Sequence, residues 1–196
     1  SFEPAGGSAL VTVIIRSVGR EPLLREALDS VALQTYPNIE VLVVNAKGPG
    51  HPDLGAWCGR FPLRLVSRDH PLARSPAANV GLDEAKGDYL IFLDDDDCFD
   101  ANHISSLVQT LQQHPEARVA YAGVQAMADP RDEPSSTRPL VFNNPFDPVR
   151  LRAANYIPIN AVLFARGLLS SGCRFDDELE VYEDWDFWLQ LSRLTT

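Results

Sequence analysis

One apolar run that ends in four aspartates constrains this 196-residue chain more than any other feature. The run covers residues 89–93 (YLIFL), and Asp94, Asp95, Asp96 and Asp97 follow it directly. A short run without polar interruption is typical of a central strand in a parallel sheet, because such a strand is covered on both faces. Open sheets of this kind bind ligands beyond the carboxyl ends of their strands. We therefore expect the four carboxylates at a ligand-binding edge.

Strand-like and helix-like segments alternate along the chain. We expect further strands at 9–15, 39–44, 63–66, 117–127 and 161–164, and helices at 22–34, 76–86, 100–114 and from Glu183 to the end of the chain. Asp100 is expected to cap the third helix. The alternation predicts an α/β fold with a mostly parallel central sheet flanked by helices. We expect a single domain over residues 9–196, after a loose leader at 1–8 and with a surface excursion at 129–148.

The charge balance narrows the possible partners. Seventeen basic and twenty-seven acidic residues give a net charge of -10, which disfavours nucleic acid as a partner. The three cysteines have no paired spacing, so we expect a reducing compartment. No apolar run approaches the ~20 residues that span a bilayer, and the N-terminus does not resemble a signal peptide. We expect a soluble, cytoplasmic domain, and contact with the inner membrane face through parts outside this chain stays open.

The acidic run suggests a metal site. Adjacent carboxylates repel one another, and exposure, a raised pKa or a bound cation relieves that repulsion. On an extended backbone, Asp94 and Asp96 would project to one side and Asp95 and Asp97 to the other. Oxygen ligands of this kind suit Mn²⁺ or Mg²⁺, whose shell a diphosphate completes. The alternative is a solvated loop whose acids cap the next helix.

A second acidic pair, Glu183 and Asp184, begins the last helix among aromatic residues. Acidic residues are favoured at a helix N-terminus in any case, so the pair alone does not establish a site. Together with the distant acidic run, it matches what glycosyl transfer needs. A metal there stabilises the departing nucleoside diphosphate, and a separate carboxylate takes the proton of the acceptor hydroxyl.

Six short motifs together resemble the family 2 glycosyltransferases over about residues 9–193. They are LDSV at 28–31, QTYP at 34–37, NVGL at 79–82, GDY at 87–89, FLDDDD at 92–97 and ED at 183–184. The resemblance implies the GT-A nucleotide-binding fold and an inverting transfer. It implies that Asp94 and Asp96 form the Asp-x-Asp signature, and that Asp96 and Asp97 contact ribose and metal. Asp184, with Glu183 beside it, corresponds to the catalytic base.

The donor site departs from the family pattern at several positions. An acidic residue commonly follows the second strand, but Asn45-Ala46 stands here, and Ala78 replaces a frequent Arg. Asn45 is still able to hydrogen bond a pyrimidine edge. The expected donor contacts are Ser17, Asn45, Arg74, Asn79, Asp94 and Asp96, with Arg74 as the nearest diphosphate contact. These departures are compatible with an altered donor or a weakened enzyme.

Two alternatives to an active glycosyltransferase remain. One is a catalytically weak or inactive nucleotide-sugar-binding domain of a larger protein. The other is a nucleotidyltransferase, which would need a Gly-rich phosphate loop after the first strand, whereas residues 16–20 contain a single Gly. The interpretation as an active glycosyltransferase, which we favour, implies a UDP-, dTDP- or GDP-sugar donor and a carbohydrate or lipid-linked acceptor. It also implies further domains in a longer parent protein and a role in bacterial surface-polysaccharide synthesis.

Overall fold

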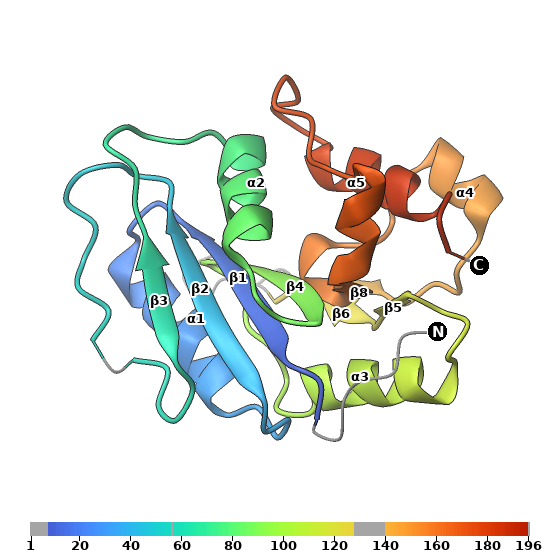
Figure 1. Cartoon of the computed structure of the whole chain (residues 1–196), viewed down its shortest axis with the longest axis horizontal. Coiled ribbons are helices and arrows are strands. Elements are labelled where there is room, and N and C mark those ends of the chain that lie inside the picture. Colours follow the sequence, from blue (N-terminus) through green and yellow to red (C-terminus); the bar gives the residue numbers. More distant parts are fainter. Residues whose placement is uncertain (1–7, 56, 128–139, 196) are drawn as a thin grey trace.

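The computed structural model describes residues 8–55, 57–127 and 140–195, and a six-stranded sheet lies between two layers of helices (Figure 1). The strand order is β3-β2-β1-β4-β8-β5. The strands are β1 (Val11–Ser17), β2 (Ile39–Asn45), β3 (Leu63–Val66), β4 (Tyr89–Asp94), β5 (Val119–Tyr121) and β8 (Val162–Ala165). The first four are parallel, whereas β8 is antiparallel to both β4 and β5. The predicted fold class, a mostly parallel sheet flanked by helices, is therefore confirmed.

The register of the central strands brings polar residues together at one edge. Strand β1 pairs with β2 on one side and β4 on the other, so Ser17 lies beside Asn45 and Arg16 beside Asp94. All three strands are parallel and end at this edge. The first aspartate of the acidic run therefore lies among the tips of three neighbouring strands, as the sequence predicted.

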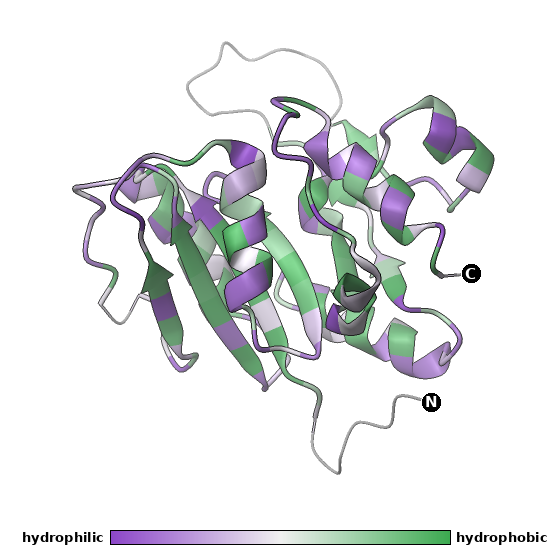
Figure 2. Ribbon diagram, turned by 45° about the horizontal axis from the view of Figure 1, so that its top comes forward, coloured by the Kyte–Doolittle hydropathy of each residue, from purple (hydrophilic) through white to green (hydrophobic). Residues whose placement is uncertain are grey.

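Two helices cover each face of the sheet. Helices α1 (Glu21–Ala32) and α3 (His103–Gln113) bury their apolar stripes on one face, while α2 (Arg74–Glu84) and α5 (Glu183–Leu191) pack on the other (Figure 1). The apolar stripes recur at helical spacing, and Figure 2 shows hydrophobic residues continuing along the strands between the layers. On the second face, Phe187 stacks on Phe175 with ring centroids 4.4 Å apart. This packing anchors α5 against the sheet.

Helix α2 lies very close to β1 because a glycine faces the strand. A Cβ on Gly81 would lie 2.4 Å from Cγ2 of Ile14, closer than any real Cβ contact. Another close approach occurs at Gly87, where a Cβ would lie 2.6 Å from the backbone N of Thr12. Gly87 therefore serves the packing of β4 against β1, and helix α2 ends before it, at Glu84.

Several sequence-based boundaries were wrong. Helix α3 begins at His103 without a side-chain cap from Asp100, because the side chain of Gln34 accepts the N–H of Ile104 at 3.1 Å. Helix α5 ends at Leu191 and does not run on to the end of the chain. The expected strand at 117–127 is two short strands, β5 and β6 (Val124–Gln125), since the chain leaves β8 after Tyr121 to pair with β7 (Val141–Phe142).

Other elements were not expected or lie outside the described residues. Helix α4 (Pro148–Ala153) was missed, although Asp147 caps it by accepting the N–H groups of Val149 and Arg150. Short 3₁₀ turns η1 (Ile159–Ala161) and η2 (Arg166–Ser171) flank β8. The expected leader, apart from Ser8, and residues 129–139 of the expected surface excursion lie outside the described residues. Within the described part of the chain, no helix is both long and apolar enough to cross a membrane.

Candidate active site

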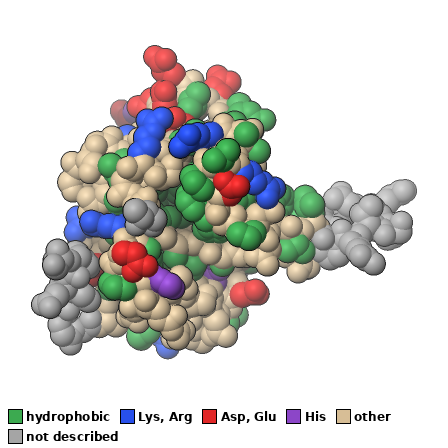
Figure 3. All heavy atoms as spheres, turned by 90° about the vertical axis from the view of Figure 1, so that its right-hand side faces the viewer, with side chains coloured by type: hydrophobic (Ala, Val, Ile, Leu, Met, Phe, Trp, Pro, Cys, Tyr) green, Lys and Arg blue, Asp and Glu red, His purple; other side chains and the backbone are tan. Residues whose placement is uncertain are grey.

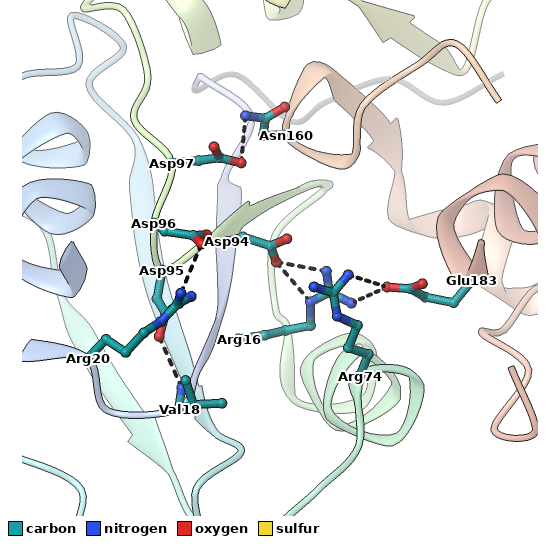
Figure 4. A network of polar contacts seen from close by, with 10 residues as sticks. All are labelled: Arg16, Val18, Arg20, Arg74, Asp94, Asp95, Asp96, Asp97, Asn160 and Glu183. Atoms are coloured by element: carbon teal, nitrogen blue, oxygen red, sulfur yellow. Dashed lines mark hydrogen bonds and ion pairs between the residues drawn. The ribbon is translucent and has the colours of Figure 1, made fainter. Parts of the chain in front are cut away.

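The acidic run forms a turn at the tip of β4. The strand ends at Asp94, and the N–H of Asp97 donates to the carbonyl of Asp94 at 3.1 Å. The expected alternation of side chains along an extended backbone is therefore wrong. The turn separates the four carboxylates: Asp94 pairs with Arg16, Asp95 and Asp96 share Arg20, and Asp97 contacts Asn160 (Figure 4).

Arg16 neutralises the first aspartate from the neighbouring strand. Its Nη2 and Nε lie 2.7 Å and 3.1 Å from Oδ1 of Asp94, and its Nη1 lies 3.0 Å from Oε1 of Glu183. The arginine side chain is 7% exposed. Burial alone would lower the pKa of Arg16, but the charges and hydrogen bonds of Asp94 and Glu183 outweigh it and raise the pKa. The guanidinium is therefore a permanent cation at the centre of the site.

Arg20, in the loop after β1, forms ion pairs with the second and third aspartates. Asp95 is buried, and it accepts hydrogen bonds from the backbone N–H of Val18 at 3.0 Å and from Arg20. Arg20 also contacts Asp96 at 3.0 Å, and both of these side chains are 45% exposed. Asp95 therefore ties the loop after β1 to the tip of β4, and Asp96 faces the solvent beside it.

Asp97 is the aspartate of the run that has no cationic partner among the described residues. Its Oδ2 accepts a hydrogen bond from Nδ2 of Asn160 at 3.0 Å. Burial, followed by the negative charges of Asp94 and Asp96, raises the pKa of Asp97 to about 6. A carboxylate in this electrostatic position is stabilised by a bound cation.

The donor set at this turn fits a divalent cation of the Mg²⁺ or Mn²⁺ type. Within the described residues, no group of three or more His, Cys, Asp or Glu side chains converges on one point. Such ions commonly take one or two carboxylates from the protein and complete their shell with water and phosphate oxygens. Asp97, which lacks a cationic partner, and the exposed Asp96 meet that requirement together with a phosphate ligand.

The second acidic pair begins helix α5, across the site from the turn. Glu183 is buried, and its Oε1 lies 3.0 Å from Arg16 and 3.7 Å from Nη1 of Arg74. Asp184 accepts hydrogen bonds from Nδ2 of Asn155 at 3.0 Å and from the N–H of Trp185 at 2.8 Å. Burial is the main cause that raises the pKa of Asp184, with a further contribution from Glu183. The two neighbours therefore differ: one is locked in ion pairs and the other is held by neutral donors.

Two expected donor contacts are engaged in internal hydrogen bonds. Both amide hydrogens of Asn45 are used, by the carbonyl of Gly48 at 2.7 Å and by Oγ of Ser67 at 3.2 Å, and its oxygen accepts two backbone N–H groups. Asn79 joins α2 to the loop before α5 by bonds to the backbone of Phe175 and to Asp177. Asn45 could donate a hydrogen bond to a nucleotide sugar only if one of these internal bonds broke, because both N–H groups of its amide are already used.

Ser17 and Arg74, two further expected donor contacts, lie near the edge of the sheet that holds the acidic turn. Ser17 is buried at the tip of β1, and its Oγ is 2.9 Å from Nε2 of His51 and accepts the N–H of Gly19. Arg74 is the first residue of α2, and its side chain is 66% exposed. Figure 4 shows its guanidinium next to that of Arg16, pointing toward Glu183. Arg74 therefore contacts Glu183 at 3.7 Å and still exposes much of its side chain to an anion from the solvent.

Four residues at the site were not expected there from the sequence: Arg16, Asn155, Asn160 and His51. The position of Arg16 directly after an apolar run was a usable signal. A charged residue at the end of a buried strand needs a partner of opposite charge, so its position predicts an ion pair. The two asparagines lie in irregular segments, where no periodicity marks them. Each has a buried amide oxygen for which the described part of the chain provides no hydrogen-bond partner. Buried polar atoms usually have partners, so these two amides are candidates for contact with a ligand.

An apolar cavity lies apart from this site. It has a volume of about 220 Å³ and lies between β5, α4 and the end of α5, and none of the candidate site residues lines it. Its lining includes Val119, Phe146, Leu151 and Trp188. Figure 3 shows hydrophobic side chains gathered on this side of the molecule among interspersed acidic and basic ones. The polar edge of the sheet remains the candidate active site.

Comparison with known sequences agrees with this geometry. The family model described as glycosyl transferase family 2 matches residues 12–169. An uncharacterized glycosyltransferase of Bacillus subtilis, YwdF, is 25% identical over 187 residues, covering 93% of this chain and 68% of the relative. The glycosyltransferase GlyA of Streptococcus pneumoniae is 33% identical over 109 residues, covering 53% of this chain and 15% of the relative.

Two groups of solved structures share the fold. Residues 1–349 of S. aureus TarS in complex with UDP-GlcNAc give a TM-score of 0.71 at 19% identity, with 92% of this chain and 52% of that chain covered. The mannosyltransferase PcManGT of Pyrobaculum calidifontis, in complex with GDP-Man and Mn²⁺, gives 0.64 at 21% identity, with 93% and 51% covered. The chain therefore spans about half the length of each of these two solved chains.

Proposed function

This chain belongs to glycosyl transferase family 2, and we propose that it transfers a sugar from a nucleoside-diphosphate donor to an acceptor hydroxyl with inversion. The donor is a UDP-, dTDP- or GDP-sugar, in line with the UDP-GlcNAc and GDP-Man bound by proteins of the same fold. The acceptor is a carbohydrate or a lipid-linked saccharide. The domain belongs to a longer protein in this proposal, since the solved relatives extend well beyond the shared part.

One observation carries the proposal: a single guanidinium joins the two acidic segments. Arg16 contacts both Asp94, at the tip of β4, and Glu183, at the start of α5. These carboxylates are far apart in the sequence, and the contact brings the acidic turn and the Glu183–Asp184 pair to opposite sides of one site (Figure 4). Direct displacement at a sugar carbon needs this arrangement, with a leaving-group site on one side and a base on the other.

On the donor side, exposed cationic and anionic side chains are available for the nucleotide. Arg74 offers a guanidinium, which suits the diphosphate. Asp96 and Asp97 would hold Mn²⁺ or Mg²⁺, and the bound cation would stabilise the charge of the departing nucleoside diphosphate. Asp94 and Ser17 lie below the proposed donor position, at the ends of β4 and β1. Asn160 keeps the carboxylate of Asp97 oriented.

On the acceptor side, Asp184 is the base. The raised pKa of its carboxyl, caused mainly by burial, makes the carboxylate a better proton acceptor than an exposed aspartate. The amide of Asn155 and the N–H of Trp185 both donate to the same oxygen, Oδ1, which leaves Oδ2 for the acceptor hydroxyl. As the acceptor oxygen attacks the anomeric carbon, its proton passes to Asp184 and the bond to the nucleoside diphosphate breaks. Glu183 supports this base through its ion pairs.

The proposal is tested by binding and turnover in a matched pair of variants. UDP, GDP and dTDP are titrated with and without Mn²⁺ by thermal shift, and the breakdown of UDP-GlcNAc and GDP-Man is followed. At 100 times Kd, the correct nucleotide should stabilise the fold by about 2.7 kcal/mol. Asp184→Asn should keep that stabilisation but lose about 10²- to 10⁴-fold in turnover.

Asp186→Asn is the control, because Asp186 lies in the same helical turn and bonds to Gln190 along the helix. It should keep both properties. If Asp184→Asn turns over as fast as the wild type, the base is misassigned. Binding of a nucleotide without any breakdown of donor would identify a binding domain, and no binding under any condition would refute the donor site.

A further inference from the structure

Arg16 occupies an unusual position for a charged residue. It is the second-last residue of β1, a strand whose residues are all buried, and Arg16 itself is 8% exposed. A buried charge is tolerated when it is paired and fully hydrogen bonded. Three of its nitrogens meet this condition with Asp94 and Glu183. The guanidinium also lies over the ring of Phe92, 5.9 Å from its centroid.

The two partners of Arg16 belong to opposite sides of the site. Asp94 is its neighbour in register across parallel strands, so that contact is set by the sheet. Glu183 comes from a helix on one face of the sheet, and its place depends on tertiary packing. A planar guanidinium is able to donate to two carboxylates at fixed angles, which a lysine ammonium does less well. Arg16 therefore bridges a point fixed by the sheet register and a helix start placed by tertiary packing.

The start of α5 needs such a bridge. Tyr182, which precedes the helix, has a φ of 62°, the left-handed conformation that is unfavourable for residues other than glycine. Its side chain provides no capping hydrogen bond. Strained backbone of this kind persists where the surroundings hold it in place. The ion pairs of Glu183, the next residue, tie this turn to Arg16 on β1 and to Arg74 on α2.

We propose that Arg16 is a positioning residue for sugar transfer: by bridging Asp94 and Glu183, it fixes the helix start that presents Asp184 to the acceptor. This inference rests on the proposed function. Arg16 is too deeply buried to serve as a donor ligand, unlike the exposed Arg74. It acts through Glu183, so its loss should change the placement of the base more than the binding of nucleotide.

The test compares Arg16→Lys with Arg64→Lys. Arg64, on β3, makes the same kind of contact, to the side chain and the carbonyl of Glu84, but lies away from the site. Arg16→Lys keeps the positive charge but loses the planar guanidinium that donates to Asp94 and Glu183 together. We expect kcat for donor breakdown to fall roughly 10- to 100-fold, because displacements of about 1 Å have effects of this size. Nucleotide Kd should change less than about threefold, and Arg64→Lys should match the wild type.

Glu183→Ala provides a second variant that leaves Arg16 paired with Asp94. It should lose as much kcat as Arg16→Lys, and the double variant should lose little more, because both break one bridge. After burial, which is the main cause, the negative charge of Glu183 raises the pKa of Asp184, and the positive charge of Arg16 lowers it. Glu183→Ala should therefore lower the pKa of Asp184 and move the acid limb of the kcat–pH profile to lower pH.

Amide hydrogen exchange over residues 183–187 gives a readout that does not depend on turnover. Exchange there should speed up in Arg16→Lys and in Glu183→Ala, with little change in the rest of α5. Folded variants with wild-type kcat and exchange would overturn the inference, and so would a loss confined to nucleotide binding. If the wild type itself neither binds nucleotide nor cleaves donor, the proposed function fails, while the exchange data still decide whether Arg16 positions the helix.

Discussion

Replacing Asp97 by asparagine should make the unliganded protein more stable at neutral and alkaline pH. Burial and the charges of Asp94 and Asp96 raise the pKa of Asp97 from 3.8 to about 6 in the folded state. The folded protein then binds more protons than the unfolded chain between these two values, so stability falls as the pH rises through this window. The charged Asp97 is therefore unfavourable above pH 6. Asparagine removes the charge and can still accept the hydrogen bond from Asn160.

The size of the effect follows from the shift. Each pKa unit corresponds to 1.36 kcal/mol, so a shift of about two units gives about 3 kcal/mol at full strength. Asp97 is partly exposed, and solvent screening reduces this figure to roughly 1–2 kcal/mol. We expect Asp97→Asn to gain that amount at pH 8 and nothing at pH 4, where the wild-type carboxyl is protonated in the folded state.

Urea unfolding in EDTA at pH 8, 6 and 4 measures this gain. Asp96→Asn is the control: it removes one of the charges that repel Asp97 but also loses the ion pair with Arg20 at 3.0 Å, so it should stabilise less than Asp97→Asn. Adding Mn²⁺ with nucleotide should reverse the order at pH 8, since the wild type alone would gain a ligand. An Asp97→Asn variant no more stable than the wild type at pH 8, or equally stabilised at pH 4, would refute the reasoning.

Three further predictions concern the fold. Tyr182→Gly should be more stable than Tyr182→Ala by about 1 kcal/mol, because only glycine relieves a φ of 62°; equal urea midpoints would contradict this. Gly81→Ala should destabilise by roughly 1–3 kcal/mol in urea, since its Cβ would lie 2.4 Å from Ile14, and a more stable variant would be inconsistent with that contact. Burial raises the pKa of Cys58 to about 12, so a thiol reagent at pH 8 should modify the exposed Cys98 first; equal rates would count against it.

The sheet edge and its acidic turn could be predicted because local patterns encode them. An uninterrupted apolar run is a property of neighbouring residues, and so is the helical spacing of Leu24, Leu28 and Val31. Parallel topology then places the ends of β1, β2 and β4 at one edge. The helix boundaries were less accurate, because a residue from another element decides where a helix begins: Gln34 caps α3 from 70 positions away.

The sequence by itself determined the fold class, the family resemblance and the place of the carboxylates at the strand tips, since strand and helix periods follow from the covalent geometry of the chain. Only the tertiary structure decided which charges meet. Arg16 finds Glu183 across 167 positions, Asn45 turns into its own loop, and Asp97 is left without a cation among the described residues. Ion pairs depend on distances through space, and the local periodicity of a sequence does not reveal those distances. The distances decide which charges of the candidate site are neutralised by a partner.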